Sequence, residues 1–129
     1  MNKKAKILIT AAVIIVIAAS LLYFVLFNKA KESGTFDLAQ YSTYIENFPS
    51  EQVLGAVDSP KAAKEKAETV WLGIYGDTIK EEKPYQVLFD EASQVWLVHG
   101  TIPKGMDGGE AFILLQKADG KVLAVWHDK

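Results

Sequence analysis

An uncharged, apolar run near the N-terminus constrains this chain more than any other feature of its sequence. Residues 7–27 (ILITAAVIIVIAASLLYFVLF) contain no charged side chain, and only Thr10, Ser20 and Tyr23 among them are polar. As an α-helix this run would be roughly 31 Å long, about the thickness of the hydrocarbon core of a bilayer. The sequence therefore predicts an uncleaved transmembrane anchor over residues 7–27.

A cleaved secretory signal peptide is the alternative for this run. However, the run is longer than the ~7–15 apolar residues of a signal core, and no small-x-small cleavage site follows it. Lysines flank the run on both sides: Lys3, Lys4 and Lys6 before it, Lys29 and Lys31 after it. Three lysines before the run against two after it favour a cytoplasmic N-terminus. We expect a single-pass protein of the cell membrane, with residues 1–6 in the cytoplasm and the C-terminal domain outside.

The charge of the remaining chain excludes one class of function. Beyond residue 27 there are 11 lysines against 16 acidic residues, a net charge of −5. All 14 basic residues of the chain are lysines, so the planar arginine fork that grips phosphates is missing. We therefore expect no nucleic-acid binding. Cysteine is absent, which excludes a lipoprotein anchor and any disulfide.

Helical spacing occurs twice after a short polar stretch at residues 28–35. The first helical segment would start at a capping Asp37 and stop before Pro49. The second is predicted over residues 60–75, between Ser59 as N-cap and Gly76 as C-terminal stop. The apolar stripe of this second helix consists of Ala63, Ala67, Val70, Trp71 and Ile74. Its opposite face carries two pairs of opposite charge one turn apart, Lys61 with Glu65 and Lys64 with Glu68.

The C-terminal third has the composition of β-strands. Four strands are predicted, at Tyr85–Phe89, Gln94–Ile102, Ala111–Gln116 and Lys121–His127. Their short connections indicate an antiparallel meander. We therefore expect an α+β domain over residues 53–129, in which one main helix packs on a four-stranded antiparallel sheet. Residues 28–52 are expected to form a tether and a short helical segment.

These strands are apolar on both faces, whereas one helix covers only one face. We expect residues 36–57 to cover part of the second face and to leave some concave apolar surface free. The tryptophans 71, 96 and 126 are expected in the core, where each ring nitrogen needs a hydrogen-bond partner.

The sequence holds few candidates for chemistry. His99 and His127 have no convergent partners at catalytic or ligand spacing, so no catalytic residue, metal site or cofactor is predicted. Glu65, Glu68, Glu81 and Glu82 are expected to be solvated. The glycine-rich loop 103–110 joins two strands rather than opening a helix, so it is no phosphate loop.

In that loop, positive φ angles are expected at Gly105, Gly108 and Gly109. The predicted partner-binding residues lie in or next to the loop: His99, Lys104, Asp107 and Glu110.

An ordered set of motifs is shared with a known family. In chain order these are AxxxAETVWLGIYG from Ala63, KPYQV from Lys83, VWLVHGTIPKG from Val95, GGEAFILL from Gly108 and DGKVLAVWHDK from Asp119. Over about residues 53–129 the chain resembles the nuclear-transport-factor-2-fold immunity proteins of bacteria. The resemblance implies a truncated cone-shaped, cystatin-like fold. It also implies a non-enzymatic protector that neutralises a toxin of a polymorphic or contact-dependent system, and it carries no catalytic residues over.

Three hypotheses for function follow. The first is a membrane-anchored, non-catalytic immunity protein whose partner is a cognate protein toxin. The second is an envelope module that binds a small molecule or peptide on the apolar sheet face. The third, an enzyme, would need a buried carboxylate or histidine pair, which the strands do not offer. The sequence leaves the toxin's identity and the oligomeric state open.

Overall fold

The computed structural model describes residues 3–4, 6, 13–22, 33–103, 105 and 108–129. The chain divides into two compact units, Met1–Glu32 and Ser33–Lys129. In the first unit residues 13–22 are α-helical with exposed apolar side chains, and the Ser20 hydroxyl donates a 2.8 Å hydrogen bond to the Val16 carbonyl. None of the described helices is long and apolar enough to cross a membrane. Residues 7–12 and 23–27 of the predicted anchor lie outside the described residues.

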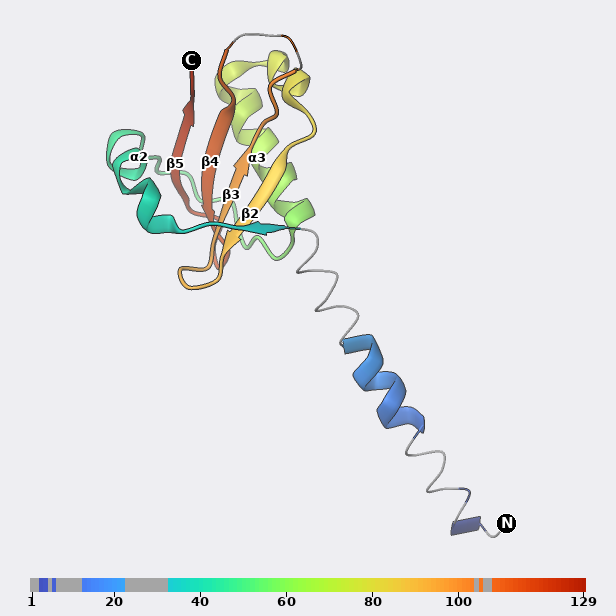
Figure 1. The fold of residues 1–129 in the computed structure, drawn as a ribbon. Coiled ribbons are helices and arrows are strands. Elements are labelled where there is room, and N and C mark those ends of the chain that lie inside the picture. Colours follow the sequence, from blue (N-terminus) through green and yellow to red (C-terminus); the bar gives the residue numbers. More distant parts are fainter. Residues whose placement is uncertain (1–2, 5, 7–12, 23–32, 104, 106–107) are drawn as a thin grey trace. The chain divides into compact units, whose positions relative to one another are not determined.

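The second unit is an α+β domain built on a five-stranded sheet with the strand order β1-β2-β3-β4-β5 (Figure 1). The four predicted strands are present as an antiparallel meander, β2 to β5. The prediction of a four-stranded sheet is nevertheless wrong, because β1 adds a fifth strand, parallel to β2. A two-residue strand is too short for any periodic pattern to reveal it. In chain order the elements are β1 (Gly34–Thr35), η1 (Leu38–Tyr41), α2 (Ser42–Asn47), α3 (Pro60–Tyr75), η2 (Asp77–Glu82), β2 (Gln86–Asp90), β3 (Val95–His99), β4 (Ala111–Gln116) and β5 (Val122–His127).

The main helix α3 starts and ends where its capping residues predict. The Ser59 hydroxyl accepts a 3.1 Å hydrogen bond from the Ala62 amide, and Pro60 occupies the first turn. At the other end Gly76 has a φ of 76°, and its amide donates to the Leu72 carbonyl. Both ends thus satisfy backbone groups that the helix itself cannot pair.

The core between α3 and the sheet contains two tryptophans with satisfied ring nitrogens. Trp71 on α3 is fully buried and its Nε1 lies 3.4 Å from the Phe112 carbonyl oxygen. Trp96 on β3 is 5% exposed and its Nε1 donates a 2.8 Å hydrogen bond to the Val57 carbonyl. No buried side-chain polar atom in the described residues lacks a partner, so this core is both apolar and fully hydrogen-bonded.

The opposite face of the sheet is covered by η1 and α2. The Tyr44 ring stacks on Trp126 of β5, with 4.4 Å between ring centroids and 23° between planes. Beneath this cover Leu97 and Leu114 are fully buried. The expectation of a free concave apolar surface is therefore wrong for the centre of this face. The cover extends further than the helical spacing suggested, because aromatic rings of the short helices reach across the strands.

Residues 48–57 carry the chain from one face to the other along the free edge of β5. Four backbone hydrogen bonds fasten this segment. The amides of Val125 and Val122 donate to the carbonyls of Phe48 and Gln52, and the amides of Leu54 and Val57 donate to the carbonyls of Gly120 and Lys117. At the opposite edge β1 pairs with β2. Residues 34–52, which the sequence assigns to a tether and a short helical segment, thus form β1, η1, α2 and much of this edge cover. The β5 edge is thus covered by this segment, and the β2 edge is paired with β1 at Leu88 and Phe89.

Candidate functional site

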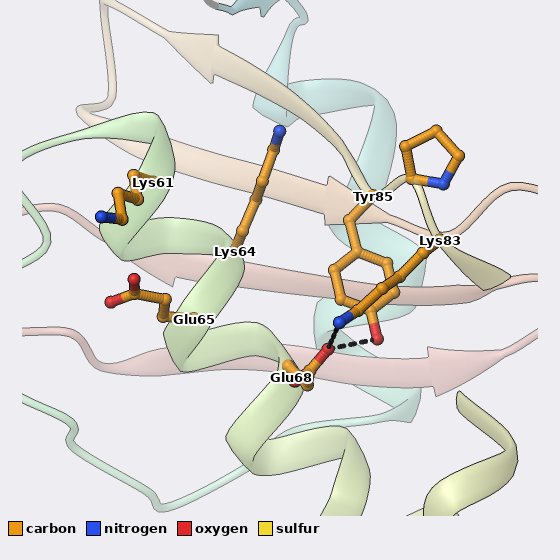
Figure 2. Close-up of a pocket in the computed structure, with 7 residues that line it drawn as sticks. Lys61, Lys64, Glu65, Glu68, Lys83 and Tyr85 are labelled. Carbon is orange, nitrogen blue, oxygen red and sulfur yellow. Dashed lines mark hydrogen bonds and ion pairs between the residues drawn. The ribbon is translucent and has the colours of Figure 1, made fainter. Parts of the chain in front are cut away.

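A groove lies between the exposed side of α3 and the residues that lead into β2 (Figure 2). Its volume is about 620 Å³, within the range of ligand-binding clefts. It is lined by Lys61, Lys64, Glu65, Glu68, Lys83, Pro84 and Tyr85. Four of these come from α3, where positions 61, 64, 65 and 68 share one side because they are three or four residues apart.

A tyrosine and a lysine converge on one carboxylate in this groove (Figure 2). The Tyr85 hydroxyl donates a 2.7 Å hydrogen bond to Glu68 Oε2, and Lys83 Nζ lies 3.1 Å from the same oxygen. Burial and the hydrogen bond to Glu68 raise the pKa of Tyr85. The hydrogen bond from Tyr85, with the charge of Lys83, lowers the pKa of Glu68 against the effect of burial. Glu68 is therefore an ionised carboxylate with both neighbours in place.

The wall of the groove opposite α3 contains Tyr85, which is packed into the core. The Tyr85 ring is 6% exposed and packs edge-to-face on Trp71, with 5.1 Å between centroids. The Tyr85 hydroxyl also lies 3.3 Å from the Ile79 carbonyl oxygen. The Tyr85 side of the groove is thus part of the core rather than a mobile surface side chain.

The two pairs predicted along α3 do not form. Among the described residues neither Lys61 nor Lys64 has a carboxylate within 4.0 Å of its ammonium. Glu68, the expected partner of Lys64, is occupied instead by Lys83 and Tyr85. The groove thus has two uncompensated ammonium groups on its helical side.

The predicted partner-binding residues lie partly within the described residues. His99 Nδ1 is 3.5 Å from Glu110 Oε1 and 2.8 Å from the Gly100 carbonyl oxygen, and its ring stacks on Phe112. The structure therefore brings two of the four together at the end of β3 and β4. Lys104 and Asp107 lie outside the described residues.

A second histidine pairs with a glutamate at the same end of the sheet. His127 Nε2 lies 3.0 Å from Glu82 Oε2, and the other oxygen of Glu82 accepts a 2.8 Å hydrogen bond from the Ala111 amide. The prediction that Glu82 is solvated is wrong: its side chain is 14% exposed. Burial lowers the pKa of His127, but hydrogen bonds to Glu82 and to the Asp128 carbonyl outweigh it, so that this pKa is raised.

The glycine-rich loop is shaped by two different requirements. Gly105 and Gly108 have φ angles of 83° and 123°, as predicted. Gly109 has no positive φ; instead, a Cβ there would collide with the Asp128 backbone, so the position needs the absence of a side chain. In the described part of the chain no three His, Cys, Asp or Glu side chains gather as metal ligands.

Sequence reasoning missed the groove although each wall was predicted. Tyr85 and Lys83 belong to the motif KPYQV, and α3 was placed correctly, but their contact depends on how the helix crosses the sheet. What this surface offers chemically is recognition: a fixed Glu68–Lys83–Tyr85 cluster and two lysines that are unpaired among the described residues.

The comparisons with known proteins agree with this fold. The family model described as NTF2 fold immunity protein matches residues 62–129, more than half of the chain, from the first turn of α3 to the C-terminus. No curated protein and no solved structure matches.

Proposed function

The chain belongs to the NTF2 fold immunity protein family, and on this premise we propose that it neutralises a cognate protein toxin by binding it, without catalysis. The family match is the observation that carries the proposal. It covers α3 from Ala62 onward, the whole meander and all of the groove residues except Lys61.

The packing of the domain supports binding by an outer surface. Helix α3 fills one face of the sheet and the short helices η1 and α2 cover the other. A module that held a ligand on the apolar sheet face would need that face open, and its central leucines on β3 and β4 are fully buried. Contacts with a partner are therefore left to the groove, the loop end and the exposed helices.

We propose that residues 7–27 tether this domain to the cell membrane as a single-pass helix. Support comes from the uncharged run of the sequence and from residues 13–22, which are helical and expose only apolar or small side chains. The lysine excess before the run favours a cytoplasmic N-terminus and an extracytoplasmic domain. A toxin that acts on the cell wall or membrane would then meet the domain where it acts.

The loop end is the proposed position for part of the toxin contact. His99 and Glu110 lie side by side there, and Lys104 and Asp107 belong to the same loop. Thr101, two residues after His99, donates a 2.6 Å hydrogen bond to the Pro84 carbonyl, so this end adjoins the groove.

Co-expression tests the proposal. Each secreted product encoded beside this gene is expressed in a sensitive host, with and without the full chain, and captured on the tagged chain from detergent extract. We expect one product to be toxic alone, harmless with the chain, and retained on it. If no neighbouring product is both toxic and bound, the proposed function is wrong.

Fractionation tests the anchor separately. The full chain should sediment with membranes, resist extraction by carbonate and enter solution only with detergent. A variant with Ile14, Ile17 and Leu21 changed to lysine should lose this behaviour, because each charge near the helix centre costs about 2.5–3.5 kcal/mol on insertion. Recovery of the unchanged chain in the soluble fraction would contradict the tether.

A further inference from the structure

The groove on α3 differs in charge from the domain around it. Its lining holds three lysines against two glutamates, whereas the chain beyond residue 27 has a net charge of −5. Fields of exposed charges fade over a Debye length of about 8 Å at physiological salt. A group that enters the groove is therefore governed by the local lysines rather than by acids elsewhere on the surface.

Within the groove the charges are not equally available. Glu68 is already satisfied by Lys83 and Tyr85, as Figure 2 shows. Lys61 and Lys64 are exposed and unpaired among the described residues. With Glu68 paired, Glu65 is the one remaining acidic residue of the lining. Two ammonium groups can thus accept a carboxylate without first breaking an ion pair, which removes one cost of binding.

Apolar surface lies beside these charges. Pro84 is exposed opposite α3, with the buried Tyr85 ring next to it, and the long stems of the lysines add methylene groups. Because Tyr85 is packed on Trp71 and bonded to Glu68, this wall keeps its shape before a partner arrives.

We infer that this groove binds an acidic segment of the toxin. One or two of the segment's carboxylates would pair with Lys61 and Lys64, and a neighbouring apolar side chain would pack on Pro84 and the lysine stems. The inference rests on the proposed function and specifies which surface of the domain recognises the partner and by which chemistry. Charge complementarity selects this occupant, since a basic segment would face the two free ammonium groups.

Charge reversal in the full chain tests the inference. The variant K61E/K64E is compared with the matched variant K121E/K129E, which makes the same change in net charge at exposed lysines outside the groove. Affinity for the purified toxin is measured by calorimetry on detergent-solubilised protein. We expect the dissociation constant to rise at least about tenfold for the groove variant and to change less than about threefold for the control.

Each result has a distinct meaning. Toxin binding by wild type with equal affinity for both variants would overturn the groove assignment and leave the immunity function standing. If wild type binds no neighbouring toxin, both proposals fail. Both variants should keep the native circular dichroism spectrum and a cooperative thermal transition well above the assay temperature, because the changed side chains are exposed.

A competition experiment distinguishes a peptide segment from a small anion. A short peptide of alternating glutamate and leucine should displace the toxin from wild type but not weaken the residual binding of K61E/K64E. Inorganic phosphate at the same concentration of charge should displace far less. Equal displacement by phosphate would overturn the assignment to an acidic segment.

Discussion

Replacement of Trp96 by phenylalanine should destabilise the domain through one hydrogen bond. The Trp96 ring nitrogen donates to the Val57 carbonyl at 2.8 Å, and both residues are buried. Phenylalanine keeps most of the aromatic packing but removes this donor. The Val57 carbonyl then stays buried without the partner it has in the wild-type chain.

The expected loss can be worked out by comparison with Trp71. A buried acceptor left without its donor costs about 1–3 kcal/mol. The same substitution at Trp71 removes the same atoms from an equally buried site, but there the nitrogen is 3.4 Å from its acceptor, too long for a strong bond. We therefore expect Trp96→Phe to cost about 1–2 kcal/mol more than Trp71→Phe.

Urea unfolding followed by circular dichroism measures this difference. With a slope of about 1–2 kcal/mol per molar urea, the midpoint of Trp96→Phe should lie about 1 M below that of Trp71→Phe. The two slopes should agree, since neither change alters the surface exposed on unfolding. Equal midpoints, or a lower midpoint for Trp71→Phe, would refute the role given to the hydrogen bond.

Three further predictions concern other parts of the domain. Gly120→Ala should cost at least about 2 kcal/mol in the same urea assay, because φ is 69° and the new Cβ would collide with the Gly55 carbonyl; a cost below about 0.5 kcal/mol would contradict the close approach. The raised pKa of His127 means that its pairing with Glu82 stabilises the fold fully below about pH 6.5 and loses this effect as the pH rises through the folded-state pKa. The stability advantage of wild type over His127→Gln should therefore be larger at pH 5.5 than at pH 8.5, and a larger advantage at pH 8.5 would refute the pairing. Tyr44→Ala removes the ring that stacks on the tryptophan of β5 and should cost about 2 kcal/mol, with a rise in binding of a hydrophobic dye as the sheet face opens; unchanged dye binding would contradict the covering role of α2.

The net charge of the domain and the lysines of the groove are expected to affect different steps of partner binding. The net charge of −5 beyond residue 27 influences encounter, while the lysines of the groove act only at contact distance. A toxin with a basic body and one acidic segment would satisfy both. Added salt should therefore change the association rate and the dissociation rate by different factors.

Capping residues, helical spacing and β-strand propensity predicted the elements that depend on residues close together in the sequence. Helix α3 runs from Pro60 to Tyr75 as the cap at Ser59 and the stop at Gly76 require. The meander follows from four runs of β-forming residues and their short turns. The segment before Pro49 was predicted as one helix, whereas it divides into the 3₁₀ turn η1 and the short helix α2; its apolar side chains do pack on the sheet.

The candidate site was much less predictable. His99 and Glu110 were named from the loop that joins their strands, and they do lie within 3.5 Å of each other. The groove was not foreseen, since Tyr85 and Glu68 are 17 residues apart and meet only through packing. The role of Glu82 was misjudged for the same reason: its partner His127 is 45 residues away.

The amino-acid sequence alone determined the main helix with its caps, the four-stranded meander and the apolar character of both sheet faces, because propensity, capping and alternation act between residues close in the chain. Only the tertiary structure decided the fifth strand, the closed second face and the lysine-lined groove. These depend on where residues 34–57 and α3 cross the sheet, and that crossing is set by the fit of buried rings and by the need to pair the free edges of β2 and β5.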